Sequence, residues 1–195
     1  MATVDYKLIK NFFSKEELNL VKKYCYNKLD LNKDYKLDSQ SFSPAWYNDS
    51  LMTSFLDVKL PIVEKESNLK LFPTYAYWRY YVFGAVLKKH TDRPSCEISI
   101  TACIKKYDNW PIVVERTSFE LEEGDAILYA GHAQEHGRPG IYKGEGMAQV
   151  FLHYVDQNGP FTHHQYDNYL NENKRQASDS DYKILDKLTN NDKKQ

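Results

Sequence analysis

The N-terminal part of the chain carries the hydrophobic pattern of an amphipathic helix. Its apolar residues recur every three or four positions, which places them on one helical face: Leu18, Val21, Cys25 and Leu29. Just before them, Ser14-Lys15-Glu16-Glu17 forms a capping box, in which the serine hydroxyl and the last carboxylate satisfy the first free backbone N–H groups. We therefore predict a helix over 14–29, preceded by a short strand at 6–9.

The pattern after this helix is less regular. Residues 30–50 are polar with a few aromatic positions, which predicts a loop and suggests a lid over a site. A second helix is predicted over 50–66, interrupted early by Pro61, because proline lacks the N–H group of a helical hydrogen bond. These segments together make a helical N-terminal part, residues 1–70.

From Leu71 onward the periodicity is that of strands. Short segments alternate polar and apolar positions, and clusters of glycine or aspartate separate them. The predicted strands are 75–83, 97–104, 111–115, 117–121, 125–130, 136–142 and 147–155. Strands at this spacing are typical of a β-sandwich or barrel, and helices that precede strands favour a jelly roll flanked by helices.

These patterns divide the chain into one domain and a tail. We predict a single domain over 1–165 with its β core at 71–156, followed by a polar C-terminal extension, 166–195. The pattern of the extension permits a helix at 179–189. The chain has 195 residues of which 42% are hydrophobic, enough to bury one core.

Charge and cysteine content narrow the classes of function. Lys and Arg total 26 against 27 Asp and Glu, and this balance argues against nucleic acid as a partner. Cys25, Cys96 and Cys103 form no CxxC pair, so we expect buried free thiols. No apolar run approaches the roughly 18 residues that cross a membrane, and the first residues lack the apolar stretch of a signal peptide. We therefore expect a soluble cytoplasmic protein with no membrane partner.

The segment KKHTDRP, residues 88–94, carries candidate metal ligands. His90 and Asp92 are two positions apart, so on extended backbone both side chains point to the same face. An imidazole and a carboxylate supply two of the three ligands of an iron-binding facial triad, and the third is a histidine from another strand. His132 and His136 are the candidates. We prefer His136, because it opens a predicted strand while His132 falls in a loop.

Further motifs surround these residues in a fixed order. They are Tyr81-Val82-Phe83-Gly84, His90-Thr91-Asp92, Gly124-Asp125-Ala126-Ile127-Leu128-Tyr129 and Glu135-His136. Their order and spacing resemble the prolyl-4-hydroxylase-like branch of the Fe(II)/2-oxoglutarate-dependent oxygenases. The N-terminal IKNFFSKEELNLVKKYC is similar to the opening helix of that branch, so the resemblance covers residues 6–156.

The resemblance implies a fold, ligands and a reaction. The fold would be a double-stranded β-helix of about eight strands, with iron held by His90, Asp92 and His136. Tyr81, in the Y-x-x-G element, would contact 2-oxoglutarate. The co-substrates would be 2-oxoglutarate and O2, with ascorbate as an optional reductant. The reaction would hydroxylate a C–H bond, most simply in a prolyl or other amino-acid side chain of a peptide.

One departure from the family pattern concerns the far carboxylate of 2-oxoglutarate. The family usually places a basic residue about ten positions after the distal histidine, but residues 144–149 here contain neither Lys nor Arg. An unpaired buried carboxylate is costly, so another cation must serve. Arg138 is the first candidate, because it shares a strand face with His136 and its fork suits a carboxylate. Arg79 is the second and Lys143 the third.

Other residues have a functional and a structural interpretation. Tyr77, Arg93 and Trp110 are candidate substrate contacts, whereas as structural residues they would be a core aromatic, a solvated cation and a turn anchor. Arg79 is also a candidate for an ion pair with Glu97 or Glu115. We expect His153 to be a hydrogen-bonded residue of a sheet and not a ligand.

Two rival functions follow from the same residues. The iron chemistry could act on a small metabolite, a lipid or a nucleobase instead of a peptide. Alternatively, the barrel is a binding module without redox chemistry, in which His90 and Asp92 only form hydrogen bonds.

Overall fold

The structure, a computed structural model, describes residues 4–31 and 35–168. Helix α1 is Lys15–Leu31 and helix α2 is Ser50–Ser67. The strands are β1 Lys7–Ile9, β2 Lys36–Leu37, β3 Pro44–Tyr47, β4 Leu71–Tyr81, β5 Leu87–His90, β6 Ile98–Lys106, β7 Ile112–Val114, β8 Thr117–Phe119, β9 Ala126–Tyr129, β10 His136–Arg138 and β11 Met147–Asp156. Short 3₁₀ segments are Pro94–Cys96 and Thr162–Asn168. The helix predicted at 179–189 lies outside the described residues.

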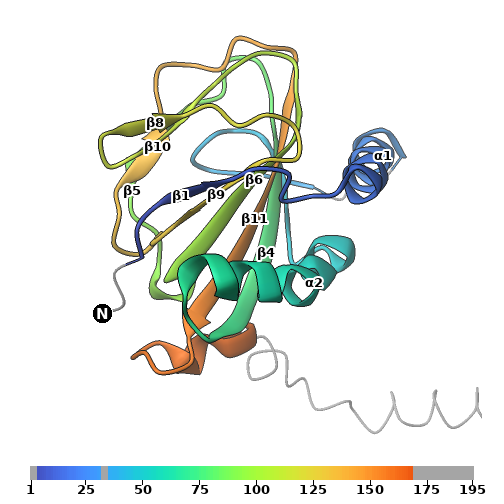
Figure 1. Ribbon diagram of the computed structural model, residues 1–195. Coiled ribbons are helices and arrows are strands. Elements are labelled where there is room, and N and C mark those ends of the chain that lie inside the picture. The colour runs from blue at the N-terminus through green and yellow to red at the C-terminus, as the bar shows by residue number, and fades with distance from the viewer. Residues whose placement is uncertain (1–3, 32–34, 169–195) are drawn as a thin grey trace, which may run out of the picture.

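The strands form two antiparallel sheets (Figure 1). The larger sheet has the order β1-β9-β6-β11-β4-β3-β2, and the smaller has the order β5-β10-β7-β8. The long strands β4 and β11 pair along almost their whole length and form the centre of the larger sheet. The prediction of a mainly β fold with flanking N-terminal helices is confirmed.

Both helices pack on one face of the larger sheet, on the side away from β5, β8 and β10 (Figure 1). Their buried residues, such as Val21 and Met52, form one core cluster with Trp78 and Ile100. On β4 alternate residues take opposite sides, as the two-residue period of a strand requires. Trp78 faces this core, whereas its neighbour Arg79 faces the smaller sheet and the space between the sheets.

The capping box at the start of α1 is present as predicted. The Ser14 amide donates to Glu17 Oε2 over 2.7 Å, and the Glu17 amide donates to Ser14 Oγ over 3.2 Å. The same Glu17 carboxylate receives Lys59 Nζ of α2 at 2.6 Å, and Lys59 also donates to the Phe12 carbonyl. This buried lysine therefore ties the two helices to the N-terminal segment.

Two predictions for the N-terminal part were wrong. Helix α2 is not interrupted at Pro61 and continues to Ser67. Pro61 is exposed, while Leu56 and Val63 on the other face are fully buried, so packing on the sheet outweighs one lost hydrogen bond. The segment 30–50 is also not wholly irregular, because it contains β2 and β3. Strand β3 joins the sheet edge by pairing Trp46 with Trp78, whose rings stack 3.9 Å apart.

Two expectations drawn from composition are consistent with the structure. Cys25, Cys96 and Cys103 are all buried free thiols, as expected. Within residues 4–31 and 35–168, neither helix is long and apolar enough to cross a membrane. The division into a domain at 1–165 and an extension at 166–195 stays a prediction.

Candidate active site

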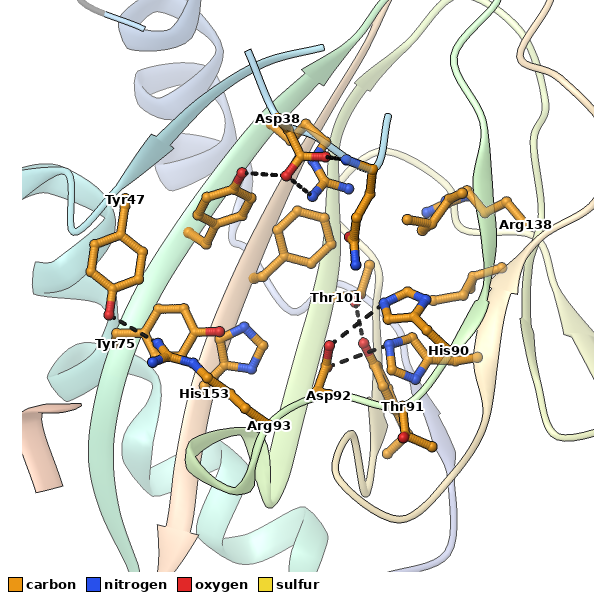
Figure 2. A pocket seen from close by; sticks show the side chains of 18 of the residues that line it. Asp38, Tyr47, Tyr75, His90, Thr91, Asp92, Arg93, Thr101, Arg138 and His153 are labelled. Carbon is orange, nitrogen blue, oxygen red and sulfur yellow. Dashed lines mark hydrogen bonds and ion pairs between the residues drawn. The ribbon is translucent and has the colours of Figure 1, made fainter. Parts of the chain in front are cut away.

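A cavity of about 440 Å³ opens between the two sheets (Figure 2). It is lined by polar, charged and aromatic side chains, chiefly Asp38, Tyr47, Tyr75, Tyr77, Arg79, His90, Asp92, Arg93, Thr101, Tyr129, His136, Arg138, Phe151 and His153. Most of these residues come from β4, β6, β9 and β11 of the larger sheet and from β5 and β10 of the smaller one. The cavity is therefore the interior of the β-helix.

His90, Asp92 and His136 meet in this cavity. His90 ends β5 and His136 begins β10, and the two residues are direct partners in the antiparallel register. His90 Nε2 lies 3.6 Å from Asp92 Oδ1, and His136 Nε2 lies 3.4 Å from Asp92 Oδ2. The candidate ligand atoms of all three residues lie within 4.8 Å of one another, so one ion can be shared among them.

The backbone fixes the orientation of both imidazole rings. His90 Nδ1 lies 2.8 Å from the Lys88 carbonyl, and His136 Nδ1 lies 3.0 Å from the Gln134 carbonyl. A carbonyl only accepts, so each Nδ1 carries the proton and each Nε2 presents a lone pair. Metal-binding histidines are commonly held in this way. The donor set of two imidazoles and one carboxylate fits a ferrous ion.

Asp92 is held in place by the turn that carries Gly131. Its amide donates to the Gly131 carbonyl over 2.9 Å. Burial raises the pKa of Asp92, but the adjacent imidazoles of His136 and His90 outweigh burial and leave that pKa well below its ordinary value. The carboxylate is therefore ionised and able to bind a cation at neutral pH.

Gly137 explains how β10 can lie so close to β5. A Cβ atom at this position would lie 2.9 Å from the Leu87 carbonyl oxygen and 2.9 Å from the Lys89 amide nitrogen. Only glycine therefore allows this approach, and the approach places His136 opposite His90.

The structure separates the two histidines considered for the third ligand position. His132 lies in the turn before β10, with Nδ1 3.4 Å from the Asp92 carbonyl and its ring against Phe161. It does not belong to the cluster that His136 forms with His90 and Asp92. The geometry thus favours His136, as the sequence did.

Arg138 is a buried cation without an acidic partner among the described residues. It donates to the Trp110 carbonyl and, over 3.1 Å, to Gln149 Oε1, while its Nε has no partner. Burial lowers the pKa of the guanidinium. A buried charge of this kind needs an anion, so Arg138 suits the far carboxylate of a dicarboxylic acid.

Arg79 already has a counter-ion. Its guanidinium lies 2.8 Å from Asp38 Oδ2 and donates to the Tyr81 hydroxyl over 2.9 Å. The predicted partners Glu97 and Glu115 were wrong, because Asp38 arrives from the segment between β2 and β3, which the sequence alone does not place. Arg79 is therefore less suited than Arg138 to hold a second carboxylate.

Three further predicted residues do not line the cavity. Tyr81 is fully buried behind Arg79 and Arg138, because it lies at the end of β4 where an aromatic cluster closes the barrel. Trp110 is buried in the same cluster and donates its indole N–H to the Pro139 carbonyl over 2.7 Å, so it is not at the cavity mouth. Lys143 is exposed on the loop before β11, away from the cavity.

Sequence reasoning missed two residues that line the cavity near Arg138. Tyr129 on β9 and Thr101 on β6 share a hydrogen bond of 3.1 Å, and both are buried. The Tyr129 ring lies 4.7 Å from that of His136. Tyr129 is the one hydroxyl residue of the otherwise apolar β9, a signal that could have drawn attention to it, whereas Thr101 is one of several polar residues of β6.

An aromatic wall lies on the other side of Asp92 (Figure 2). The Arg93 guanidinium lies 4.4 Å from the centre of the Tyr75 ring, and that ring packs on His153 at 4.4 Å. Tyr77 also lines the cavity and donates its hydroxyl to Asp38 over 3.0 Å. His153 Nδ1 lies 2.9 Å from Ser99 Oγ, so it is a hydrogen-bonded residue of β11, as expected.

No family model and no curated protein matches this sequence. Solved structures do match its fold. The non-heme α-ketoglutarate-dependent epimerase SnoN from nogalamycin biosynthesis has a TM-score of 0.65 at 9% identity, over 78% of this chain and 79% of that chain. A Pseudomonas putida prolyl-4-hydroxylase has a TM-score of 0.63 at 10% identity, over 80% and 95% of the two chains.

An oxidoreductase of the 2OG-Fe(II) oxygenase family from Burkholderia pseudomallei has a TM-score of 0.62 at 12% identity, over 79% and 86% of the two chains. At these low sequence identities, the comparisons show a shared fold and nothing more. The chain therefore has the double-stranded β-helix fold of these iron- and 2-oxoglutarate-dependent enzymes.

Proposed function

We propose that the protein is an Fe(II)- and 2-oxoglutarate-dependent oxygenase that hydroxylates a C–H bond. The observation that carries this proposal is the cluster of His90, Asp92 and His136, with both Nε2 atoms turned toward the carboxylate. Arg138, a buried cation with no acidic partner among the described residues, lines the same cavity and supports the second half of the proposal, the dicarboxylic co-substrate.

Bound iron, with 2-oxoglutarate and O2, would supply the oxidising chemistry that couples conversion of 2-oxoglutarate to succinate and CO2 with hydroxylation of the substrate. The chain's own residues bind and orient. His90, Asp92 and His136 would hold the ion. No side chain needs to act as a general acid or base.

The walls of the cavity position the co-substrate. Arg138 would hold the far carboxylate with its guanidinium fork. Thr101 and Tyr129, which line the same cavity, would offer hydroxyl groups to the same molecule. Ile112 and Leu87, apolar residues of the smaller sheet, exclude water from this end of the cavity.

For the substrate we propose a prolyl or other amino-acid side chain of a peptide, with a small molecule as the alternative. The similar structures include a prolyl-4-hydroxylase and an epimerase from nogalamycin biosynthesis, so this fold accommodates more than one class of substrate. The aromatic side chains Tyr47, Tyr75 and Tyr77 line the open side of the cavity and fit a cyclic group in either case.

The experiment is a substrate panel with Fe(II) and 2-oxoglutarate in air, read as succinate formed and as hydroxylated product by mass spectrometry. Prolyl peptides form one arm and small ring compounds the other. His136→Ala should abolish succinate formation, whereas His132→Ala, the matched control, should retain it. Equal loss in both variants, or no succinate above the iron-only background, would contradict the proposal.

A further inference from the structure

Arg93 and Tyr47 converge on a single carboxylate at the rim of the cavity. Arg93 donates to Asp167 Oδ2 over 2.7 Å, and the Tyr47 hydroxyl donates to the same oxygen. Arg93 also donates to the Tyr47 oxygen over 3.0 Å, so the two donors are held together. A guanidinium and a phenol aimed at one carboxylate oxygen form a built anion site.

This anion site lies directly beside the metal ligands. Arg93 follows Asp92 in the chain, and both line the cavity (Figure 2). The face of Tyr75 supports the guanidinium at 4.4 Å, which limits its movement. A molecule held here by a carboxylate would extend its carbon skeleton along Tyr75 toward the metal centre.

The charges of the cavity favour an anionic substrate. Arg79, Arg93 and Arg138 line it, against the carboxylates of Asp38 and Asp92. A ferrous ion adds two positive charges and 2-oxoglutarate removes two, so one net positive charge remains when the co-substrates are bound. Asp38 neutralises Arg79, and Arg138 faces the co-substrate, which leaves Arg93 as the cation available to a substrate.

The present partner of Arg93 lies on uncommon backbone. Asp167 belongs to the C-terminal segment Thr162–Asn168, where Tyr166 and Asp167 both have positive φ values of 51° and 52°. Such backbone is uncommon for a bulky residue such as Tyr166, whereas aspartate adopts it more readily. About half of the Arg93 side chain is exposed, so a soluble carboxylate can reach it.

We propose that Arg93 and Tyr47 form the carboxylate-binding subsite for the substrate, and that Asp167 occupies it until the substrate arrives. This inference rests on the proposed oxygenase function and gives the substrate class: a carboxylic acid with a ring or apolar skeleton beside the acid group. A peptide meets this description only through its C-terminal carboxylate or an acidic side chain. Arg93 and Tyr47 therefore determine specificity.

The test compares benzoate with benzamide, which have the same shape but differ in charge. Binding is measured by ligand-observed NMR to the full-length protein loaded with Fe(II) and 2-oxoglutarate under anaerobic conditions, so that the Arg138 site is filled. Benzoate should bind about tenfold more tightly, the size expected for a charge-assisted hydrogen bond. Arg93→Gln should remove this preference, and Arg116→Gln, an exposed arginine outside the cavity, should keep it.

The Asp167→Asn variant supplies a second readout. If Asp167 occupies the subsite, its loss should tighten benzoate binding several-fold and leave benzamide binding unchanged. Equal binding of the acid and the amide in both the wild type and Asp167→Asn would overturn the proposal, as would an unchanged preference in Arg93→Gln.

A further titration distinguishes a failure of the proposed oxygenase function from a failure of the Arg93 subsite. If no Fe(II)–2-oxoglutarate complex forms, the same titrations are run on the metal-free protein with Arg93→Gln and Arg138→Gln side by side. If only Arg93→Gln loses the preference for benzoate over benzamide, the proposed subsite stands without the oxygenase chemistry. If only Arg138→Gln loses that preference, the proposed subsite is overturned.

Discussion

His90 and His136 face each other as direct partners in the antiparallel pairing of β5 and β10, with ring centres 4.5 Å apart. They are 46 positions apart in the sequence, yet hydrogen bonding of the backbone sets their separation. Asp92 lies just beyond the end of β5 and closes the triangle. The candidate metal site is therefore built on paired strands of the smaller sheet, as a site of fixed geometry requires.

The first prediction concerns Arg138 and the co-substrate. Arg138→Met removes the cation but keeps an apolar side chain of similar length, so the dissociation constant of 2-oxoglutarate should rise at least about tenfold. Calorimetric titration of the Fe(II)-loaded protein without O2 measures this. Lys143→Met, an exposed lysine outside the cavity, is the control and should bind as the wild type does. Similar affinities in the two variants would contradict the assignment.

The second prediction concerns the ion pair that anchors the segment between β2 and β3. Asp38→Asn leaves the buried Arg79 cation without a counter-ion, so the free energy of unfolding should fall by about 3–5 kcal/mol. Tyr77→Phe removes only one hydrogen bond to the same carboxylate and should cost about 1 kcal/mol. Urea unfolding, monitored by tryptophan fluorescence, gives the free energy of unfolding of each variant and of the wild type. An equal, small loss in both variants would show that the ion pair contributes little.

The third prediction concerns stability against pH. Burial lowers the pKa of His153 to about 4, whereas the unfolded chain protonates the same residue near 6.5. The unfolded state therefore takes up a proton first, and the stability given by the neutral histidine is complete above about pH 6.5 and is lost as the pH falls toward 4.

Between pH 6.5 and pH 5 this linkage amounts to roughly 2 kcal/mol. The His153→Gln variant keeps a hydrogen-bond partner for Ser99 but has no group that titrates in this range. Between pH 6.5 and pH 5 its free energy of unfolding should therefore fall by roughly 2 kcal/mol less than that of the wild type. Urea unfolding at both pH values gives the difference. His163→Gln changes an exposed histidine and should follow the wild type. Identical pH dependence in wild type and His153→Gln would refute the prediction.

The fourth prediction concerns Gly131, whose carbonyl holds the Asp92 amide. A Cβ atom there would lie 2.8 Å from Asp92 Oδ2 and 2.3 Å from Ser99 Oγ. Gly131→Ala should therefore displace the carboxylate and weaken Fe(II) binding about tenfold or more, in the range seen when support around metal ligands is lost. Gly159→Ala, outside the cavity lining, serves as the comparison. Unchanged iron affinity in Gly131→Ala would show that the carboxylate is not held by this contact.

Local patterns predicted much of this fold. The capping box at Ser14, the two-residue alternation of β4 and the pairing of His90 with Asp92 each depend on residues a few positions apart, and all are found as predicted. Strands β2, β3 and β5 were missed because their few residues do not alternate between polar and apolar.

Contacts across the fold were harder to predict. The partner of Arg79 is Asp38, 41 positions away, and no local pattern identifies it. Tyr81 lies in the sequence motif that predicts a contact with the co-substrate, but at the end of β4 its side chain packs into the closed end of the barrel. Tyr129, which lies on another strand, lines the cavity instead. Side-chain direction at strand ends depends on how the sheets pack, which the sequence pattern does not contain.

The central claim is that His90, Asp92 and His136 hold iron and that the iron binds 2-oxoglutarate. Anaerobic titration of the metal-free protein with Fe(II) and then 2-oxoglutarate tests it most directly, through the visible charge-transfer band that a chelating 2-oxo acid produces. The band should appear in the wild type and in His132→Ala, and it should be absent from Asp92→Ala and His136→Ala. A band that survives in Asp92→Ala and His136→Ala, or a wild type that binds no iron, would contradict the account.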